Sequence, residues 1–407
     1  MKTYRKKIYI DLFAGCGGLS LGLHNAGWKG LFAIEKSPQA FKTLEFNLIE
    51  KVKHFKWPKW LPKQAHDINT VIAQYADKLE ELQGKVTLVA GGPPCQGFSI
   101  AGQRNENDER NKLIESYIKF VSLVKPDLIF FENVRGFTME FRNNAEKGKK
   151  YSQIVTSKLT GEGYYVYGQL VNFGEYGIPQ KRTRFILVGI RKDIKGASVG
   201  KAKSFFGKLE ENKFSFLQQK DIPISPTVEE ALSDLISSNG VVDTPDRKGF
   251  KSGLYKIPTS KYQNFVRERT KQLLFPNSHS FAKQTIPVID RLKYILSVTT
   301  ECKDIGKAMK SMLGITTQVL IPLKPHEQSP TVTSHPDDMI PYCEPRILTV
   351  RECARLQGFP DDFEFQEKYT TGGKHRKHEV PRYTQIGNAI PPLFGEQAGL
   401  TLDWLRY

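Results

Sequence analysis

The first 190 residues alternate between short apolar runs and amphipathic stretches. The apolar runs have the length of buried strands and cover residues 7–12, 31–35, 86–90 and 128–132. Helical spacing of apolar positions is found at residues 37–47 and 113–124, and a helix followed by a strand is predicted between residues 151 and 171. Strands and helices that alternate in this way predict an α/β fold with a mostly parallel, doubly wound sheet.

The pattern changes after Ile190. Residues 192–328 lack a regular alternation of strands and helices, because Pro and Gly interrupt the short apolar pieces. Regularity returns at Ser329, with a helix that has Thr349 as N-cap and Glu352 at capping-box spacing, and then an Asn-centred turn before a C-terminal helix. We therefore expect a first domain at 1–191, a second, smaller domain at 192–328, and a return to the first domain at 329–407.

The stretch from Gly91 to Ser99, GGPPCQGFS, holds a cysteine between a proline pair and a glycine. Cys95 would follow a buried strand, at the carboxyl end where open α/β sheets bind their ligands. The prolines fix φ and the glycines permit tight turns, so the loop would present the thiol rather than bury it. A buried, inert cysteine is the alternative.

A glycine-rich turn follows the first strand in DLFAGCGGLSLGL. Gly15 and Gly17 would let the backbone pass close to a ligand, and Glu35, at the end of the second strand, is placed to accept ribose hydroxyls. Ser20 stands where a dinucleotide fingerprint has its third glycine, which weakens the hypothesis of a nicotinamide cofactor. The pattern favours a cofactor that carries a nucleoside, with a solvated strand end as the alternative for Glu35.

Two further carboxylates stand out by their position. Asp67 begins a short element and could reach an adenine amino group, or it could cap a helix that starts near Asn69. Glu132 ends an apolar strand, where a desolvated carboxyl group can keep its proton near neutrality and act as an acid. The alternative for Glu132 is a structural carboxylate that caps a loop.

Polar and basic residues alternate in the segment QKRTRF. On a strand, Gln180, Arg182 and Arg184 would share one face. Arginines on one face suit contacts with phosphates or bases better than core packing, and a solvated edge strand is the alternative. The polar segment at residues 101–112 is typical of a mobile loop over a site.

The charge of the chain favours a polyanionic partner. Its 60 Lys and Arg residues outnumber its 43 Asp and Glu residues, which gives a net charge of +17. General solubility accounts for such a charge equally well. The five cysteines form no CxxC pair, so neither a zinc cluster nor a disulfide framework is indicated. No apolar run has the length of a membrane span, and the chain does not start like a signal peptide, so a cytoplasmic enzyme is expected.

Six ordered segments resemble the conserved blocks of the bacterial DNA (cytosine-5) methyltransferases. These segments are DLFAGCGGLSLGL, GGPPCQGFS, ENV, QKRTR, RECARLQGFPDDF and QIGNAIPP, and they lie within residues 8–190 and 329–395. The resemblance implies a Rossmann-like S-adenosylmethionine-dependent methyltransferase fold that needs no metal. It also makes residues 192–328 a target-recognition domain that binds double-stranded DNA.

The resemblance implies roles for individual residues. Cys95 would be the nucleophile and Glu132 the acid. Arg182 and Arg184 would fix a cytosine that is flipped out of the duplex. S-adenosyl-L-methionine would be held by Phe13, Gly15, Gly17, Leu19, Glu35, Asp67, Ile68, Pro93 and Asn388, and would leave as S-adenosyl-L-homocysteine. Contacts with DNA would come from Ser99, Gln103, Arg104, Arg110, Thr331 and Val332, where Val332 replaces the usual leucine.

The implied function is sequence-specific methyl transfer to carbon 5 of cytosine through a covalent Cys95 adduct. The protein would act as a monomer and protect host DNA from a cognate restriction endonuclease. Three other hypotheses stay open: an RNA (tRNA) methyltransferase of the same family, a catalytically silent nucleic-acid-binding protein, and a nicotinamide-dependent dehydrogenase. The size of residues 192–328 favours DNA over RNA, and the presence of Cys95 and Glu132 argues against a silent protein.

Overall fold

A computed structural model describes residues 6–94, 112–139, 150–371 and 379–407 of the chain. The chain divides into two compact units, each built from segments that are distant in sequence. Unit 1 comprises Met1–Asn172, Thr183–Lys213 and Gly395–Tyr407, and unit 2 comprises Phe173–Arg182 and Phe214–Phe394. None of the helices in the described ranges combines the length and the apolar composition that a membrane crossing requires.

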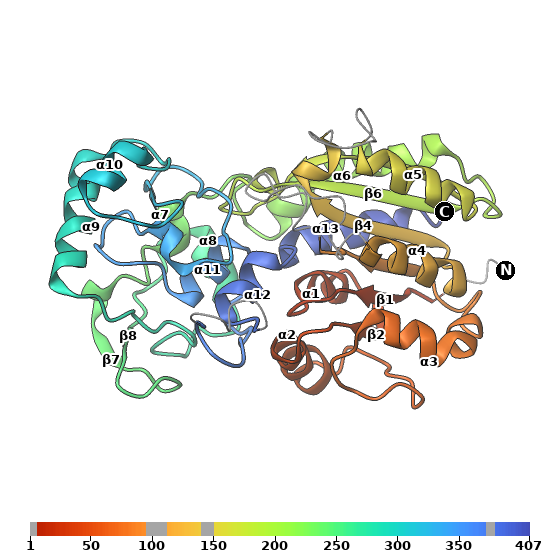
Figure 1. The fold of residues 1–407 in the computed structure, drawn as a ribbon, viewed down its shortest axis with the longest axis horizontal. Coiled ribbons are helices and arrows are strands. Elements are labelled where there is room, and N and C mark those ends of the chain that lie inside the picture. The colour runs from red at the N-terminus through yellow and green to blue at the C-terminus, as the bar shows by residue number, and fades with distance from the viewer. Residues whose placement is uncertain (1–5, 95–111, 140–149, 372–378) are drawn as a thin grey trace. The chain divides into compact units, whose positions relative to one another are not determined.

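Unit 1 is built around a six-stranded sheet with the strand order β2-β1-β3-β4-β6-β5 (Figure 1). β1 to β4 run parallel to one another, whereas β6 is antiparallel to both of its neighbours. This mostly parallel sheet confirms the predicted fold class. The strands are β1 (Ile8–Leu12), β2 (Lys29–Ile34), β3 (Leu88–Gly91), β4 (Leu128–Val134), β5 (Tyr164–Asn172) and β6 (Thr183–Arg191).

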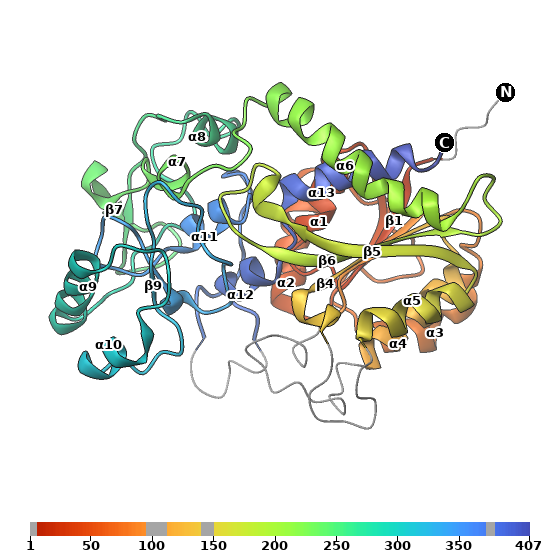
Figure 2. The ribbon, with the colours of Figure 1, turned by 90° about the horizontal axis from the view of Figure 1, so that it is seen from above.

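Helices cover both faces of the sheet in unit 1 (Figure 2). On one face, apolar side chains of α3, α4 and α5 form a single core with Ile129 and Phe131 of β4. Phe130 points to the other face and contacts Phe205 of α6, as alternation along a strand requires. The helical segments are α1 (Gly18–Asn25), α2 (Pro38–Leu44), η1 (Glu45–Lys51, π-helical), α3 (Ile68–Glu80), α4 (Lys112–Val124), η4 (Arg135–Thr138), α5 (Tyr151–Gly161), α6 (Val199–Gln219) and α13 (Pro392–Trp404), of which α6 and α13 continue into unit 2.

The strand order places a topological switch at β1. The chain passes from β1 to β2 on one side and returns to β3 on the other side, so the carboxyl ends of β1 and β3 are neighbours. Ligands of open α/β sheets bind at such a point. The helices and strands predicted for residues 37–47, 113–124 and 151–171 are confirmed as α2 with η1, as α4, and as α5 with β5.

Unit 2 contains shorter elements. Its two small sheets pair β7 with β8 in antiparallel and β9 with β10 in parallel orientation. The predicted capping box is confirmed, because the Thr349 hydroxyl accepts from the Glu352 N–H at the start of α11. The elements are η5 (Phe173–Glu175), α7 (Val228–Leu232), η6 (Ser237–Asn239), β7 (Val241–Asp243), β8 (Lys251–Gly253), α8 (Lys261–Val266), α9 (Ile286–Val298), α10 (Gly306–Met312), β9 (Ile321–Pro322), η7 (Pro336–Asp338), β10 (Met339–Ile340), α11 (Val350–Leu356) and α12 (Arg382–Asn388).

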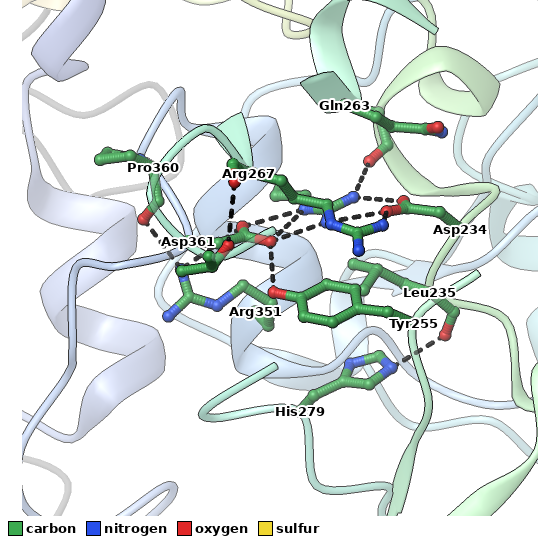
Figure 3. Close-up of polar contacts among 12 residues, drawn as sticks. Asp234, Leu235, Tyr255, Gln263, Arg267, His279, Arg351, Pro360 and Asp361 are labelled. Carbon is green, nitrogen blue, oxygen red and sulfur yellow. Dashed lines mark hydrogen bonds and ion pairs between the residues drawn. The ribbon is translucent and has the colours of Figure 1, made fainter. Parts of the chain in front are cut away.

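A buried network of charged side chains, rather than apolar residues alone, joins α11 to the segments around it in unit 2. The Arg355 guanidinium pairs with the carboxylates of Asp361 (2.7 Å from Nη2 to Oδ2) and Asp234, and all three side chains are fully buried. Arg267 donates to Asp234 at 2.9 Å, and the Tyr255 hydroxyl donates to Asp361 at 2.6 Å (Figure 3). Burial acts to raise the pKa of Asp361, but Arg355 outweighs it and the pKa is lowered.

Candidate active site

The turn after β1 has the backbone conformation that its glycines permit. Phe13, Gly15 and Gly17 have φ values of 58°, 56° and 93°. A Cβ atom on Gly17 would lie 2.7 Å from Leu48 Cδ1, so a larger residue would be strained by its φ and crowded as well. Leu19 follows in α1 and is 5% exposed. The turn therefore brings main-chain atoms, rather than side chains, to the carboxyl end of β1.

Glu35 follows the last residue of β2 and is held against this turn. Its Oε2 accepts from the Gly15 N–H at 2.8 Å, and its Oε1 accepts from the Ser37 N–H at 2.7 Å. Burial raises the pKa of Glu35, and the hydrogen bonds from peptide N–H groups oppose that shift. A carboxylate has about four acceptor positions, so Glu35 can accept further hydrogen bonds from a diol. This geometry fits the ribose of a nucleoside.

Asp67 is the N-cap of α3, which confirms the alternative that the sequence left open. Its carboxylate accepts from the Asn69 N–H at 2.8 Å and forms an ion pair of 2.9 Å with Lys36. Burial acts to raise the pKa of Asp67, but Lys36 and the N–H of Asn69 lower it. The next residue, Ile68, is 2% exposed and belongs to the core of unit 1. The adenine contact of both residues stays a prediction.

Asp11 is a functional candidate that the sequence analysis did not identify. It lies within β1, is 1% exposed, and accepts a hydrogen bond of 2.5 Å from the Ser20 hydroxyl. Burial, assisted by the charge of Glu35, raises the pKa of Asp11 to about 7. The sequence carried one signal, because an aspartate is rare at the centre of a buried parallel strand.

The raised pKa of Asp11 predicts a pH-dependent stability. The folded state binds a proton on Asp11 more tightly than the unfolded chain, so this stabilisation is complete near pH 4 and is lost as the pH rises to about 7. Asn in place of Asp11 does not titrate and can still accept from Ser20. Relative to Asp11→Asn, the wild-type free energy of unfolding should fall by about 1–3 kcal/mol between about pH 5 and pH 7. Urea titrations at several pH values measure this difference, and parallel profiles of the two proteins would contradict it.

β3 leads into the segment that contains Cys95. Gly91 pairs with Leu12 of β1, and a Cβ on Gly91 would lie only 2.4 Å from the Leu12 carbonyl oxygen. A Cβ on Gly92 would lie 2.6 Å from Glu132 Oε2, so the Glu132 carboxylate lies against the backbone at the start of the loop. Asn133 Nδ2 donates to the carbonyl of Pro93 at 3.2 Å. Two adjacent residues of β4 thus contact the backbone that precedes Cys95.

Glu132 of β4 and Arg184 of β6 form an ion pair on a diagonal, since Glu132 lies opposite Ile186 and Arg184 lies opposite Val134. Arg184 Nε lies 3.1 Å from Glu132 Oε1, and each side chain is 14% exposed. Burial lowers the pKa of Arg184, and the charge and hydrogen bond of Glu132 oppose that shift. The carboxylate that was predicted to be functional therefore has a basic partner, Arg184, which lies 52 positions later in the sequence.

The expectation that Gln180, Arg182 and Arg184 share one strand face is wrong. β6 begins at Thr183, so Gln180 and Arg182 precede the strand and belong to unit 2, whereas Arg184 belongs to unit 1. The Arg182 side chain is 2% exposed and donates to the carbonyls of Val332 at 3.1 Å and of Gly387 at 2.8 Å. Backbone acceptors far along the chain, and not strand periodicity, decide its direction. Its contact with a flipped nucleotide stays a prediction.

Gln180 connects its own segment to two others of unit 2. Its Oε1 accepts from the Val332 N–H at 2.9 Å, and its Nε2 donates to the Leu356 carbonyl at 3.0 Å and to Gln357. Thr331, beside Val332, donates its hydroxyl to the Lys181 carbonyl at 3.0 Å. The segments QKR, TV and LQGF therefore meet in one place, although about 150 residues separate the first two.

Asn388 is the last residue of α12 and is exposed. The sequence predicted only a turn here, and it missed α12 because Pro381 and the short length of the helix concealed the pattern. Pro93 is buried at the start of the loop after β3. Among the described residues, no group of three or more His, Cys, Asp or Glu side chains could hold a metal ion. Several predicted residues lie outside the described ranges: Cys95, Ser99, Gln103, Arg104 and Arg110.

Comparisons with known proteins cover nearly the whole chain. The family model of the C-5 cytosine-specific DNA methylases matches residues 8–402. The type II methyltransferase M.DdeI of Desulfomicrobium norvegicum is 30% identical over 97% of this chain and 88% of that protein. The type II methyltransferase M.XorII of Xanthomonas oryzae is 27% identical over 97% of this chain and 84% of that protein.

A solved structure agrees with these relatives. The crystal structure of a DNA modification methyltransferase encoded within a prophage of E. coli superposes with a TM-score of 0.61. It is 25% identical and covers 98% of this chain and 99% of that chain. The family match, the relatives and this fold agree with the resemblance carried by the six ordered sequence blocks. The chain belongs to the family of C-5 cytosine-specific DNA methylases.

Proposed function

We propose that this protein transfers a methyl group from S-adenosyl-L-methionine to carbon 5 of a cytosine in duplex DNA, through a covalent bond to Cys95. The observation that carries the proposal is the contact of the ENV segment with the loop before Cys95. Glu132 lies against Gly92, and Asn133 holds the carbonyl of Pro93. The proposed acid therefore lies against the end of β3, the strand that Cys95 follows in sequence.

The residues around the turn after β1 fit the methyl donor. Glu35 would accept the ribose hydroxyls, and the turn through Gly15 and Gly17 leaves room for a ligand close to the main chain, since a Cβ on Gly15 would meet no atom within 4 Å. Asp67 and Ile68 would lie at the adenine. When bound, S-adenosyl-L-methionine supplies an electrophilic methyl group. The further residues that we expect to contact it are Phe13, Leu19, Pro93 and Asn388.

The chemistry requires a nucleophile, because carbon 5 of cytosine does not attack a methyl donor by itself. The Cys95 thiolate would add to carbon 6 while Glu132 gives a proton to N3, which turns the ring into an enamine that is nucleophilic at carbon 5. Arg184, held by Glu132, would stabilise negative charge on the ring oxygen. Carbon 5 would then take the methyl group of the donor, which would leave as S-adenosyl-L-homocysteine with the electron pair of the broken bond. Loss of the proton from carbon 5 to solvent, elimination of the Cys95 thiolate and return of the N3 proton to Glu132 would complete the reaction. The base must leave the stack to reach these groups, at a cost of a few kcal/mol.

A duplex that contains 5-fluorocytosine tests this proposal. Fluorine cannot leave carbon 5 as a proton does, so the enzyme should stay covalently bound to the DNA after one methyl transfer, and peptide mass spectrometry should locate the bond at Cys95. The same duplex without methyl donor, and an unfluorinated duplex with it, should give no stable adduct. If the complete mixture methylates ordinary cytosine but traps no enzyme on the fluorinated duplex, the covalent scheme is wrong.

The names of the relatives support a biological setting. M.DdeI and M.XorII are both named type II methyltransferases. We infer that this protein likewise protects the DNA of a bacterial cytoplasm from a restriction endonuclease, and that it acts as a monomer on its site. Thr331 and Val332, with Ser99, Gln103, Arg104 and Arg110, would contact the DNA. Residues 192–328 would carry the recognition of its sequence.

A further inference from the structure

The loop between β7 and β8 carries an arginine that packs on aromatic rings and that has no hydrogen-bond acceptor for its side chain within the described residues. The guanidinium carbon of Arg247 lies 3.6 Å from the centre of the Phe250 ring and 5.0 Å from that of Tyr369. At 3.6 Å the guanidinium stacks on the face of the phenyl ring. In the part of the chain that the structure describes, Arg247 makes no hydrogen bond and no ion pair through its side chain. Its N–H donors are therefore available to a ligand.

The backbone of this loop is held in place. The Thr244 N–H donates to the Phe250 carbonyl at 2.9 Å, and the Phe250 N–H donates to the Arg247 carbonyl at 3.2 Å. Gly249 supplies the positive φ of 78° that the turn between them requires. Asp246 ties the turn to a distant segment, because its carboxylate accepts from the Tyr369 hydroxyl at 2.9 Å and pairs with Arg382. The direction of the Arg247 side chain is set before any ligand binds.

A second cation lies on the same aromatic ring. Lys283 Nζ is 4.9 Å from the centre of the Phe250 ring, and it would lie 3.8 Å from a Cβ on Gly249. Lys283, too, has no carboxylate partner among the described residues. Asp246, a carboxylate of the same turn, is already engaged by Tyr369 and Arg382. Two like charges beside one ring without a counterion favour a negatively charged ligand at this place.

Other basic residues between positions 243 and 271 differ in their partners. Lys248, Lys256 and Lys271 have, like Arg247, no carboxylate partner among the described residues. Four others have carboxylate partners within 3.5 Å, and the pairs are Lys251–Asp243, Lys261–Asp221, Arg267–Asp234 and Arg269–Asp362. A basic side chain that already forms an ion pair has to break that pair before it can bind DNA. Arg247 has no such polar contact to lose in the part of the chain that the structure describes.

We propose that Arg247 reads a guanine in the recognition sequence, with two N–H donors to O6 and N7, and that Lys283 contacts a phosphate beside it. The inference rests on the proposed function, because it supposes that unit 2 meets duplex DNA. A planar guanidinium whose orientation is fixed by stacking matches the two acceptors on the edge of guanine. The flexible ammonium group of a lysine suits a phosphate, which carries no sequence information.

Methylation of a duplex library tests the proposal. The positions around the target cytosine are randomised, and bisulfite sequencing reports which bases the full-length enzyme requires. Arg247→Ala should lose the requirement for one guanine, with kcat/KM on the wild-type site about 10- to 100-fold lower. All other base requirements should persist. Arg247→Lys keeps the charge and the aliphatic stem but not the planar fork, so it should lose the same requirement.

Two further variants separate the expected roles. Lys283→Ala should weaken DNA binding on all sequences alike and reduce the dependence on salt by about one ion. Lys251→Ala is the control, because it also removes one positive charge and lies at the end of the same loop. The Lys251 side chain pairs with Asp243 rather than lying on the Phe250 ring, so this variant should keep every base requirement.

Three results would overturn the proposal. The wild type could require no guanine, Arg247→Ala could keep every requirement, or both Arg247 variants could lose activity equally on all sequences. Melting temperatures and binding of the methyl donor check that each variant is folded, and Arg247→Gln replaces Arg247→Ala if the latter is not. A wild-type enzyme that methylates no duplex would instead refute the proposed function.

Discussion

Replacement of Glu132 by glutamine is expected to lower the kcat of methyl transfer by about 10²- to 10⁴-fold, which is the usual contribution of a general acid. Glutamine keeps the length of the side chain and an oxygen that can accept from Arg184 at the observed 3.1 Å. It also fits the space beside Gly92, where the carboxylate now lies. What it lacks is the carboxyl proton that, in the proposed mechanism, N3 of cytosine receives while the thiolate attacks carbon 6. The effect should therefore fall on kcat and not on folding.

Rapid-quench measurements of one turnover, with saturating duplex and methyl donor, give the rate of this step directly. Binding of the methyl donor, measured by calorimetry, should be unchanged in Glu132→Gln. Glu115→Gln is a matched control, since Glu115 is an exposed residue of α4 that pairs with Lys158. A Glu132→Gln enzyme with a turnover rate close to that of Glu115→Gln would remove Glu132 from the mechanism.

Replacement of Asp234 by alanine is expected to destabilise unit 2 by about 3–5 kcal/mol. Asp234 is fully buried, and its carboxylate serves both Arg355 and Arg267. Without it, two buried guanidinium groups lose a counterion. Of the ionic partners that Arg355 has among the described residues, Asp361 alone would remain. Asp234→Asn keeps the shape and part of the hydrogen bonding, so it should be affected less.

The distribution of tryptophan allows the two units to be followed separately. All four tryptophans, Trp28, Trp57, Trp60 and Trp404, belong to unit 1. Hydrogen exchange of peptides from α11 reports on unit 2 and should become faster in Asp234→Ala, whereas the tryptophan fluorescence of the native protein should not change. Asp243→Ala breaks an exposed pair with Lys251 and should cost only about 0–1 kcal/mol. Equal exchange in the two variants would mean that the buried network does not stabilise unit 2.

Features that depend on neighbouring residues could be predicted from the sequence. The capping box of Thr349 and Glu352 involves residues three apart, and the structure contains it. A run of apolar residues predicts the strand that ends at Gly91, and the glycines after Leu12 predict the turn that follows the first strand. In the structure these two strands, β1 and β3, pair in parallel. Glu35 was placed at the ligand side of the sheet because the end of its strand could be located from hydrophobicity alone.

Features that depend on distant partners could not be predicted. Arg182 looked like one of two arginines on a strand, but carbonyl groups 150 and 205 residues away determine its direction. Arg355 and Asp234 are 121 residues apart, and no local pattern marks them as partners. One signal was present: Arg355 lies on a helix whose residues are otherwise mostly apolar, and a buried arginine needs carboxylates. The sequence does not say which carboxylates these are.

Unit 2 is built from two stretches that are separate in the sequence, and this matters for protein engineering. A fragment cut at residues 214–394 would leave behind the ten residues from Phe173 to Arg182, and with them Gln180, which accepts from the Val332 N–H, and Arg182, which donates to Gly387. A chimaera that carries unit 2 on another scaffold should therefore contain both stretches. A graft of residues 214–394 alone would leave the Val332 N–H and the Gly387 carbonyl without the hydrogen bonds that Gln180 and Arg182 make to them.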